Sequence, residues 1–201
     1  MKKLMSVVAL LTLMATSAFA ENYNNGTIEL VAVTDDYAVS IKTPETGANE
    51  YGIAKNLGAF NGEFKFFQNG SVQDYQLKAT KQLMFPLGGG IDTDPFAETY
   101  VGAGMAYKWG DSLTDETLTA SPYIGVQKEM NALTPFVEVG FDWQSKSGGF
   151  TDFDRNDSYL EYGSLFKVSD KMTLSASIVE DRSNGFDLED KELALGMIIN
   201  F

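Results

Sequence analysis

Apolar residues occupy every second position in the last ten residues of the chain, ELALGMIINF. The alternating apolar residues are Leu193, Leu195, Met197, Ile199 and Phe201. Because successive side chains of a β-strand point to opposite faces, a period of two predicts a strand with one apolar face. We expect this strand to run from about Lys191 to the final residue.

The same alternation recurs in five segments upstream, and each of them predicts a further strand. These segments are 98–109, 121–129, 133–143, 158–167 and 171–181. The long stripes with a period of 3.6 that indicate amphipathic helices are missing. The pattern therefore predicts an all-β fold in a single domain.

The first twenty residues have the three parts of a secretory signal peptide. Lys2 and Lys3 precede an apolar stretch, and Ala18-Phe19-Ala20 is an A-x-A cleavage site. A retained membrane anchor is the alternative, but the apolar stretch is shorter than the roughly 20 residues that a spanning helix needs. We expect residues 1–20 to be removed by cleavage, so that residues 21–201 form the folded domain.

The composition removes several classes of function. The chain has no cysteine, which excludes disulfides and thiolate chemistry, and no histidine, the commonest general base and transition-metal ligand. Its formal charge of −13 changes to −15 without Lys2 and Lys3. Such an acidic surface repels phosphates, so nucleic acid is excluded as a partner.

The connections between the expected strands alternate in length. Segments 168–170 and 130–132 are tight turns, whereas 110–117, 144–157 and 182–190 are longer, polar and acidic. Short turns at one end and long loops at the other are typical of barrels in bacterial outer membranes. Strand alternation also fits a soluble β-sandwich, with its apolar face turned inward instead of toward lipid.

The polar face of the strands favours the barrel over the sandwich, because it combines glycines with charges of both signs that can fill a narrow lumen. The expected lumen charges are Lys108, Glu129, Glu138, Asp142, Glu161, Lys167 and Glu192. They either line a channel or form a charge network that fills a plugged lumen. Aromatic residues near the strand ends of the apolar face indicate girdles at the lipid interfaces. They are Tyr107, Trp109, Phe141, Trp143, Tyr162, Phe166 and Phe201.

The N-terminal half is expected to supply four strands. TIELVAV and YAVSIKT form a short hairpin, AFNGEFKFF follows, and VQDYQLKATKQLMFPL enters a turn at Gly88–Gly90. The total is ten antiparallel strands, or eight if one or both of the short first runs lie outside the membrane. Lys81 falls on the apolar parity of its strand, so a bulge or register break is expected there.

The final ten residues resemble the C-terminal signature of Gram-negative outer-membrane proteins, which ends in Phe after alternating apolar residues and a strand glycine. The residues that match are Leu193, Leu195, Gly196, Met197, Ile199 and Phe201. The resemblance implies that the outer-membrane assembly machinery reads this strand, which then closes the barrel against the first strand. The size resembles that of small OmpA/OmpX-type barrels and their ten-stranded relatives. Both termini would lie in the periplasm.

The sequence offers little for catalysis or cofactors. Enzymes among small outer-membrane barrels, such as phospholipases, deacylases and omptin proteases, use a histidine that this chain lacks. TDFDRND (151–157) has the acidic spacing of a calcium loop, but Asp157 and Gly163 replace the glycine and glutamate that an EF-hand requires. The glycines at 88–90 lack the Lys-Ser/Thr of a phosphate loop. We therefore expect no cofactor and no EF-hand, and interpret 151–157 as a solvated acidic loop, with a looser surface site for a divalent cation as the alternative.

The sequence thus predicts an integral outer-membrane barrel without enzymatic activity. Its expected role is structural or adhesive, with acidic loops facing an extracellular partner that the sequence does not identify. A small porin with a narrow, cation-preferring lumen is the competing interpretation. The expected surroundings are outer-membrane lipid and lipopolysaccharide.

Overall fold

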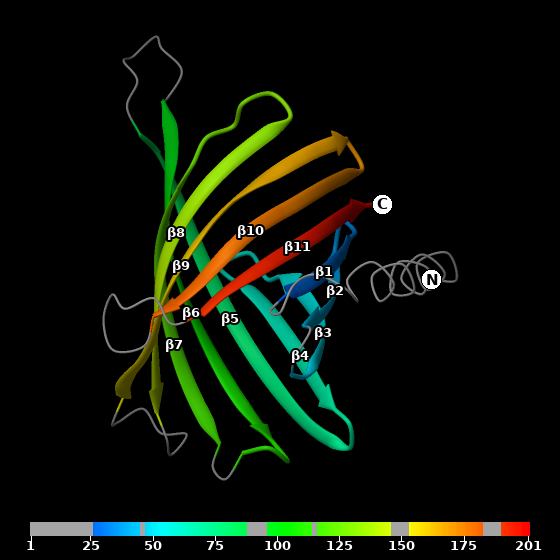
Figure 1. The fold of residues 1–201 in the computed structure, drawn as a ribbon, viewed down its shortest axis with the longest axis vertical. Helices are drawn as coiled ribbons and strands as arrows, with labels where there is room; N and C mark the ends of the chain where they lie inside the picture. The colour runs from blue at the N-terminus through cyan, green and yellow to red at the C-terminus, as the bar shows by residue number, and fades with distance from the viewer. Residues whose placement is uncertain (1–25, 45–46, 88–95, 114–115, 146–152, 183–189) are drawn as a thin grey trace.

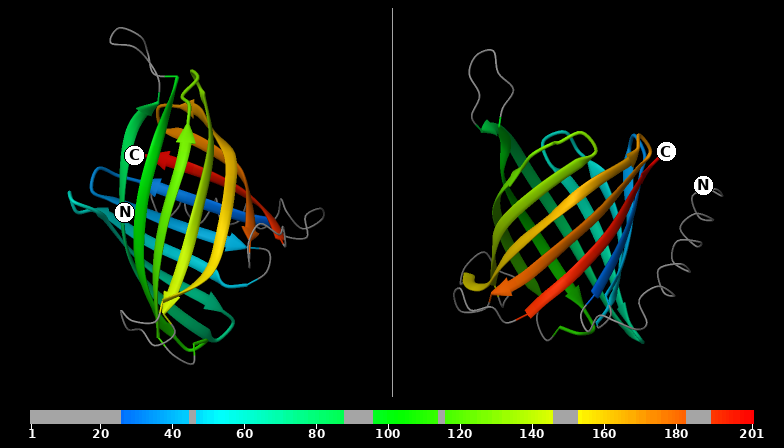
Figure 2. Two further views of the ribbon diagram at one scale, coloured as in Figure 1. Left: turned by 90° about the vertical axis from the view of Figure 1, so that its left-hand side faces the viewer. Right: turned by 45° about the horizontal axis from the view of Figure 1, so that its top comes forward.

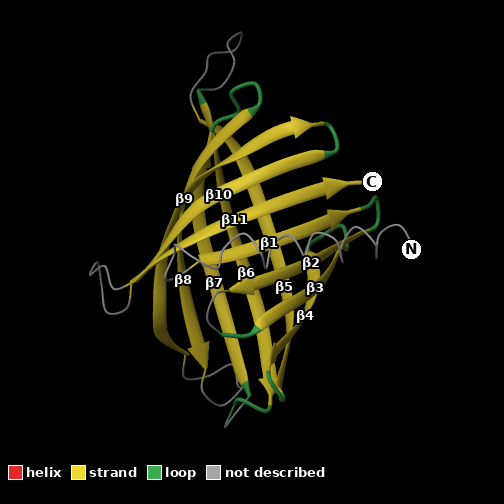
Figure 3. Ribbon diagram, turned by 45° about the vertical axis from the view of Figure 1, so that its right-hand side comes forward, coloured by secondary structure: helices red, strands yellow, loops and turns green. Residues whose placement is uncertain are grey.

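The computed structural model describes residues 26–44, 47–87, 96–113, 116–145, 153–182 and 190–201. These residues form a closed barrel of eleven β-strands (Figures 1 and 3). In chain order the strands are β1 (Gly26–Val33), β2 (Tyr37–Pro44), β3 (Asn49–Asn56), β4 (Asn61–Asn69), β5 (Val72–Leu87), β6 (Ala97–Gly110), β7 (Thr117–Gln127), β8 (Leu133–Ser145), β9 (Phe153–Ser169), β10 (Met172–Arg182) and β11 (Asp190–Asn200). The expected signal peptide and the turn at Gly88–Gly90 lie outside the described residues.

Each strand pairs with its neighbour in the sequence, and β11 closes the barrel against β1. All consecutive pairs are antiparallel, whereas β1 and β11 run parallel, with Leu30 opposite Met197. Figure 2 shows the two strands side by side at the closure. The backbone of Phe201 extends the seam, because its N–H donates to the carbonyl of Val33 at 3.0 Å. The closure leaves no unpaired sheet edge along the seam.

The strand number corrects the sequence prediction of ten or eight. The missed strand is β3, which lies between the expected first hairpin and the strand that follows it. An odd number of strands makes the closing pair parallel, so the barrel is not antiparallel throughout. For the same reason β1 begins at the end of the barrel opposite to the one where β11 finishes. The expectation that both termini lie on one side is therefore wrong for the strands themselves.

The predicted bulge at Lys81 is also wrong. β5 pairs with β6 without a shift from Asp74 to Leu87, and Lys81 lies directly opposite Ala103. Lys81 is an exposed lysine on the outward face of β5. It follows Thr80, the last residue of β5 that pairs with β4. The register shifts fall instead on β9, at its pairings with Asp142/Trp143 of β8 and Met172/Thr173 of β10.

The two faces of the strands separate apolar from polar residues, and the apolar face points outward. Leu77 is 58% exposed, Ile124 51% and Val137 49%, although each lies within a strand. These values correct the sandwich interpretation, in which the apolar side chains would form a buried core. Among the described residues, no helix is long and apolar enough to cross a membrane.

The barrel is uneven in height. β1 to β4 have eight or nine residues each, whereas β5 has sixteen and β9 seventeen. Figure 1 shows the short strands together on one side. The connections from β1 to β2, β3 to β4, β5 to β6, β7 to β8 and β9 to β10 join the strands at the end where β11 finishes. The connections from β2 to β3, β4 to β5, β6 to β7, β8 to β9 and β10 to β11 join the strands at the opposite end. The expected loop at 144–157 is shorter than predicted, because β8 extends to Ser145 and β9 begins at Phe153.

Candidate functional site

The inward face of the barrel carries most of the charged side chains of the strands. Inward positions alternate with outward apolar ones, so Glu138 lies between Val137 and Val139, and Lys78 follows Leu77. The inward acids are Glu29, Glu50, Glu63, Asp74, Glu98, Glu138, Asp142, Asp157, Glu161 and Glu192. The inward lysines are Lys42, Lys65, Lys78, Lys108 and Lys167. Acids outnumber lysines, so the described lumen has a net negative charge.

One wall of the lumen, formed by β2 to β5, holds three of the lysines among carboxylates. Lys65 Nζ lies 3.4 Å from Glu50 Oε2 and 3.8 Å from Glu63 Oε1. Lys42 lies directly opposite Glu50 in the sheet and opposite Glu29 of β1 on its other side. The attraction in each pair lowers the cost of keeping these charges inside the barrel.

The wall formed by β6 to β9 combines carboxylates with tyrosines. Tyr159 Oη donates a hydrogen bond to Glu138 Oε1 at 2.6 Å, and Tyr100 also hydrogen-bonds to Glu138. Glu161 lies directly opposite Glu138 on the neighbouring strand. Two like charges at facing positions repel each other. The two phenols thus donate hydrogen bonds to Glu138, in a site where no lysine forms an ion pair with it among the described residues.

Glycines make room for the tyrosines on this wall. Tyr100 lies opposite Gly125 and Tyr123 lies opposite Gly102. A Cβ atom on Gly125 would come within 2.2 Å of Tyr100 Cζ, so only glycine lets this ring lie flat on the neighbouring strand. The rings of Tyr100 and Tyr123 meet edge to face, with centroids 6.3 Å apart.

Near the end with the long connections, Asp74 anchors the β6–β7 connection to the barrel. Lys108 Nζ lies 3.5 Å from Asp74 Oδ2, and the N–H of Ser112 donates to Asp74 Oδ1 at 2.9 Å. On the seam, the hydroxyl of Thr27 in β1 donates to Glu192 in β11. This hydrogen bond joins the first and last strands from the inside.

The seven charges singled out from the sequence fall into two groups. Lys108, Glu138, Asp142, Glu161 and Glu192 lie at inward positions within strands. The other two lie at the rim where β11 finishes. Glu129 follows the end of β7 and is exposed. Lys167, near the end of β9, has an inward position in the strand, but its exposed ammonium group forms an ion pair with Asp170 of the β9–β10 turn at 2.8 Å. Their roles remain predictions.

Sequence reasoning missed the charges on the short strands, above all Lys42, Lys65 and Glu63. Their alternation was visible in YAVSIKT and AFNGEFKFF, but β3 was not recognised, so no sheet connected them. Its sequence NEYGIAKN carries the same signal weakly, with Tyr51 and Ile53 facing outward.

Apart from the buried Asp74, the described lumen charges remain in contact with solvent. The side chains of Glu50, Lys65 and Glu63 are 22–24% exposed, and Glu29 is exposed although it faces inward. An eight-stranded barrel is just wide enough for its side chains to fill, and wider barrels leave space. Eleven strands therefore leave room for water beside the charges.

Among the described residues, no group of three or more acidic side chains is arranged to hold a metal ion. The side chains of 153–156, in the segment with calcium-loop spacing, lie outside the described set. Comparison with protein-family models, curated proteins and solved structures found no significant match.

Proposed function

We propose that this chain is an integral β-barrel of a Gram-negative outer membrane. The exposed apolar side chains on its outward face support the proposal. Monomeric soluble proteins rarely expose contiguous apolar patches of more than a few hundred Å². In lipid such a surface is stable, and a closed barrel is the β-architecture that satisfies the backbone there.

A row of aromatic side chains near the end of the barrel opposite to Phe201 supports the proposal that the barrel sits at a defined depth in the membrane. Tyr51, Phe66, Tyr75 and Trp109 stand side by side on β3 to β6, with neighbouring ring centroids 5.5–5.9 Å apart. Rings of this kind are enriched where lipid headgroups meet the apolar core. Tyr162, expected in a girdle, lies instead near the middle of β9.

The C-terminal signature supports an orientation. Its outward residues belong to β11, and Phe201 lies at the end where the β1–β2, β7–β8 and β9–β10 turns join their strands. We propose that this end faces the periplasm and that the long connections face outward, toward lipopolysaccharide. In this account the assembly machinery binds β11 before it pairs with β1.

Within the membrane, the barrel acts as a narrow passage that prefers cations. The observation that carries this proposal is the solvent contact of the inward carboxylates, which outnumber the lysines. Rings of Asp and Glu favour cations in channels, because they raise the local cation concentration. The tyrosine hydrogen bonds to Glu138 place a carboxylate at a fixed point of this path.

Planar-bilayer recording tests the passage. Wild-type protein should give unitary conductance steps and a reversal potential of cation-selective sign in a KCl gradient. Replacing both Glu138 and Glu161 by Gln should shift this potential toward zero, whereas Glu129→Gln at the rim is the matched control. An unchanged selectivity in the double variant would overturn the role of these carboxylates.

The alternative is a structural or adhesive barrel that displays acidic loops. Asp111 and Glu116, beside the β6–β7 connection at the proposed outer end, favour it as a second candidate. A correctly inserted protein that gives no conductance would support display over transport. Binding of the wild-type barrel to a cell surface, lost on charge reversal of these two acids, would support it directly.

A further inference from the structure

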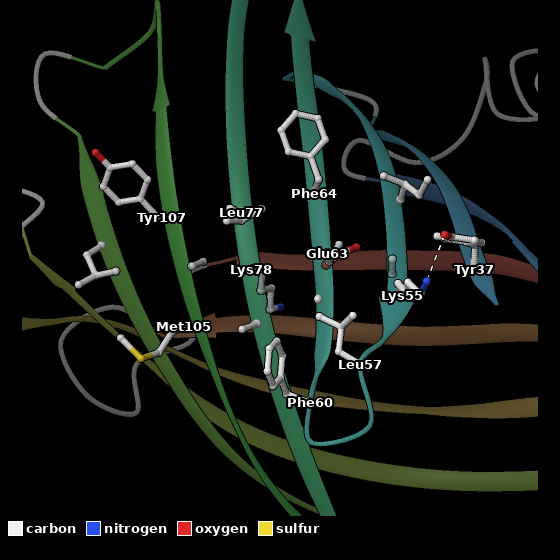
Figure 4. Close-up of a pocket in the computed structure, with 16 residues that line it drawn as sticks. Tyr37, Lys55, Leu57, Phe60, Glu63, Phe64, Leu77, Lys78, Met105 and Tyr107 are labelled. Carbon is white, nitrogen blue, oxygen red and sulfur yellow. Dashed lines mark hydrogen bonds between the residues drawn. The ribbon is translucent and has the colours of Figure 1, made fainter.

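The outward face of the barrel carries a hollow that takes no part in the proposed cation passage. It spans strands β2 to β7, has a volume of ≈ 490 Å³ and is lined mainly by apolar side chains (Figure 4). This volume lies within the roughly 300–1,000 Å³ typical of small-molecule sites. The lining includes Ile53, Phe64, Leu77 and Met105, all of which point away from the lumen.

The hollow exists because small residues meet on adjacent strands. Gly62 of β4 lies directly opposite Ala79 of β5. The large side chains of Phe64 and Leu77 rise on one side of them, and Phe60 of the β3–β4 turn rises on the other (Figure 4). The result is an apolar groove with walls, in contrast to the convex surface that a barrel of uniformly large residues would present.

A cation lies at the rim of the groove. Lys55 Nζ donates to Tyr37 Oη at 3.2 Å and lies 4.7 Å from the centre of its ring. An ammonium group has three donors, and this contact uses one. Among the described residues, no carboxylate forms an ion pair with Lys55. Lys55 is the last residue but one of β3, so it lies close to the end of the barrel where β11 finishes.

We propose that this groove binds one glycerophospholipid of net negative charge. One acyl chain lies over Gly62 and Ala79, and the phosphate accepts hydrogen bonds from Lys55 and Tyr37. The inference rests on the proposed insertion in the membrane. It selects the periplasmic leaflet, because Lys55 lies toward the end that carries Phe201. Because β3 and β4 have only eight and nine residues, we expect the lipid headgroups to lie at the level of Lys55.

The test uses full-length mature protein folded in mild detergent and native mass spectrometry. The probes are phosphatidylglycerol and phosphatidylcholine with the same palmitoyl and oleoyl chains. We expect one phosphatidylglycerol per barrel, held more tightly than phosphatidylcholine. Lys55→Met should weaken its binding about tenfold, the scale of one charge-assisted hydrogen bond. Ala79→Phe, which fills the floor, should abolish it.

Two outward residues outside the groove give matched controls, Lys81→Met and Ala103→Phe. Both should retain the lipid as the wild type does. Equal retention of both lipids, or equal loss in the control and groove variants, would overturn the inference. Heat-modifiable migration and bilayer conductance are measured on every variant. A barrel that inserts and conducts but holds no lipid contradicts this inference alone, whereas a chain that is soluble without detergent contradicts the proposed function too.

Discussion

The substitution Ile124→Arg should destabilise the barrel strongly if its outward face lies in lipid, and only slightly if that face lies in water. Ile124 lies on the outward face of β7, between Val101 of β6 and Val139 of β8, and half of its surface is already exposed. In water, replacing a side chain that is half exposed changes stability by only about 0.5 kcal/mol. In the middle of a bilayer, an arginine on the lipid-facing side of a barrel costs about 2–4 kcal/mol. The two settings thus differ several-fold in the expected effect.

The assay is urea unfolding in phosphatidylcholine vesicles, followed by the fluorescence of the two tryptophans. We expect Ile124→Arg to lower the free energy of unfolding by about 3 kcal/mol. Ser71→Arg, in the exposed β4–β5 turn, is the control and should change it by less than about 0.5 kcal/mol. A loss for Ile124→Arg no larger than that of the control would refute the claim that this face contacts lipid.

Three further predictions concern single sites. Gly125→Val should destabilise the barrel by about 1–3 kcal/mol, because the new side chain overlaps the Tyr100 ring; an unchanged urea midpoint would contradict this packing. Deleting Phe201 removes the backbone hydrogen bond that continues the seam. We expect slower assembly and accumulation in the periplasm, and normal amounts of folded barrel in membrane fractions would refute the assembly role. The hydrogen bond from Lys167 lowers the pKa of Asp170 below its ordinary 3.8. The stability from this pair should be complete above pH 3.8 and disappear as the pH falls through the lower folded-state pKa; a carboxyl titration by NMR at 3.8 or higher would exclude the bond.

Much of the barrel was predictable because alternation is a local signal. The strand predicted from VQDYQLKATKQLMFPL coincides with β5, and the segments 133–143 and 171–181 fall within two residues of β8 and β10. An outward apolar face and an inward polar face follow from the same period, once the barrel is closed. The pattern also excludes shifts of register by one residue, because such a shift would exchange the two faces, but it leaves shifts by two residues open.

The strand count depended on β3, where the local signal is weak. Only Tyr51 and Ile53 are large and apolar in NEYGIAKN, and Lys55 occupies the next outward position. The structure gives the reason for this lysine, which contacts the Tyr37 ring near the end of its strand. Missing one strand changed the number from odd to even, and with it the direction of the closing pair.

The sequence predicted which residues of these strands face the lumen, but not which of them lie opposite each other. Alternation identified Glu138 and Glu161 as inward residues, yet only the pairing of β8 with β9 brings them directly opposite each other. The glycines on this wall were understood as small residues in a crowded lumen. Their individual partners, such as Tyr100 over Gly125, depend on register between strands, which no single strand's sequence specifies.

The proposed function requires that the apolar face of the strands contacts lipid and that the polar face lines a wet lumen. Two adjacent residues of β8 test this most directly. Because the chain has no cysteine, Val137→Cys and Glu138→Cys can each carry a single spin label. In protein reconstituted in phospholipid vesicles, the label at 137 should collide mainly with oxygen, which dissolves in lipid. The label at 138 should collide mainly with a water-soluble nickel complex. The opposite result, with position 137 wet or shielded from both reagents, would contradict the account.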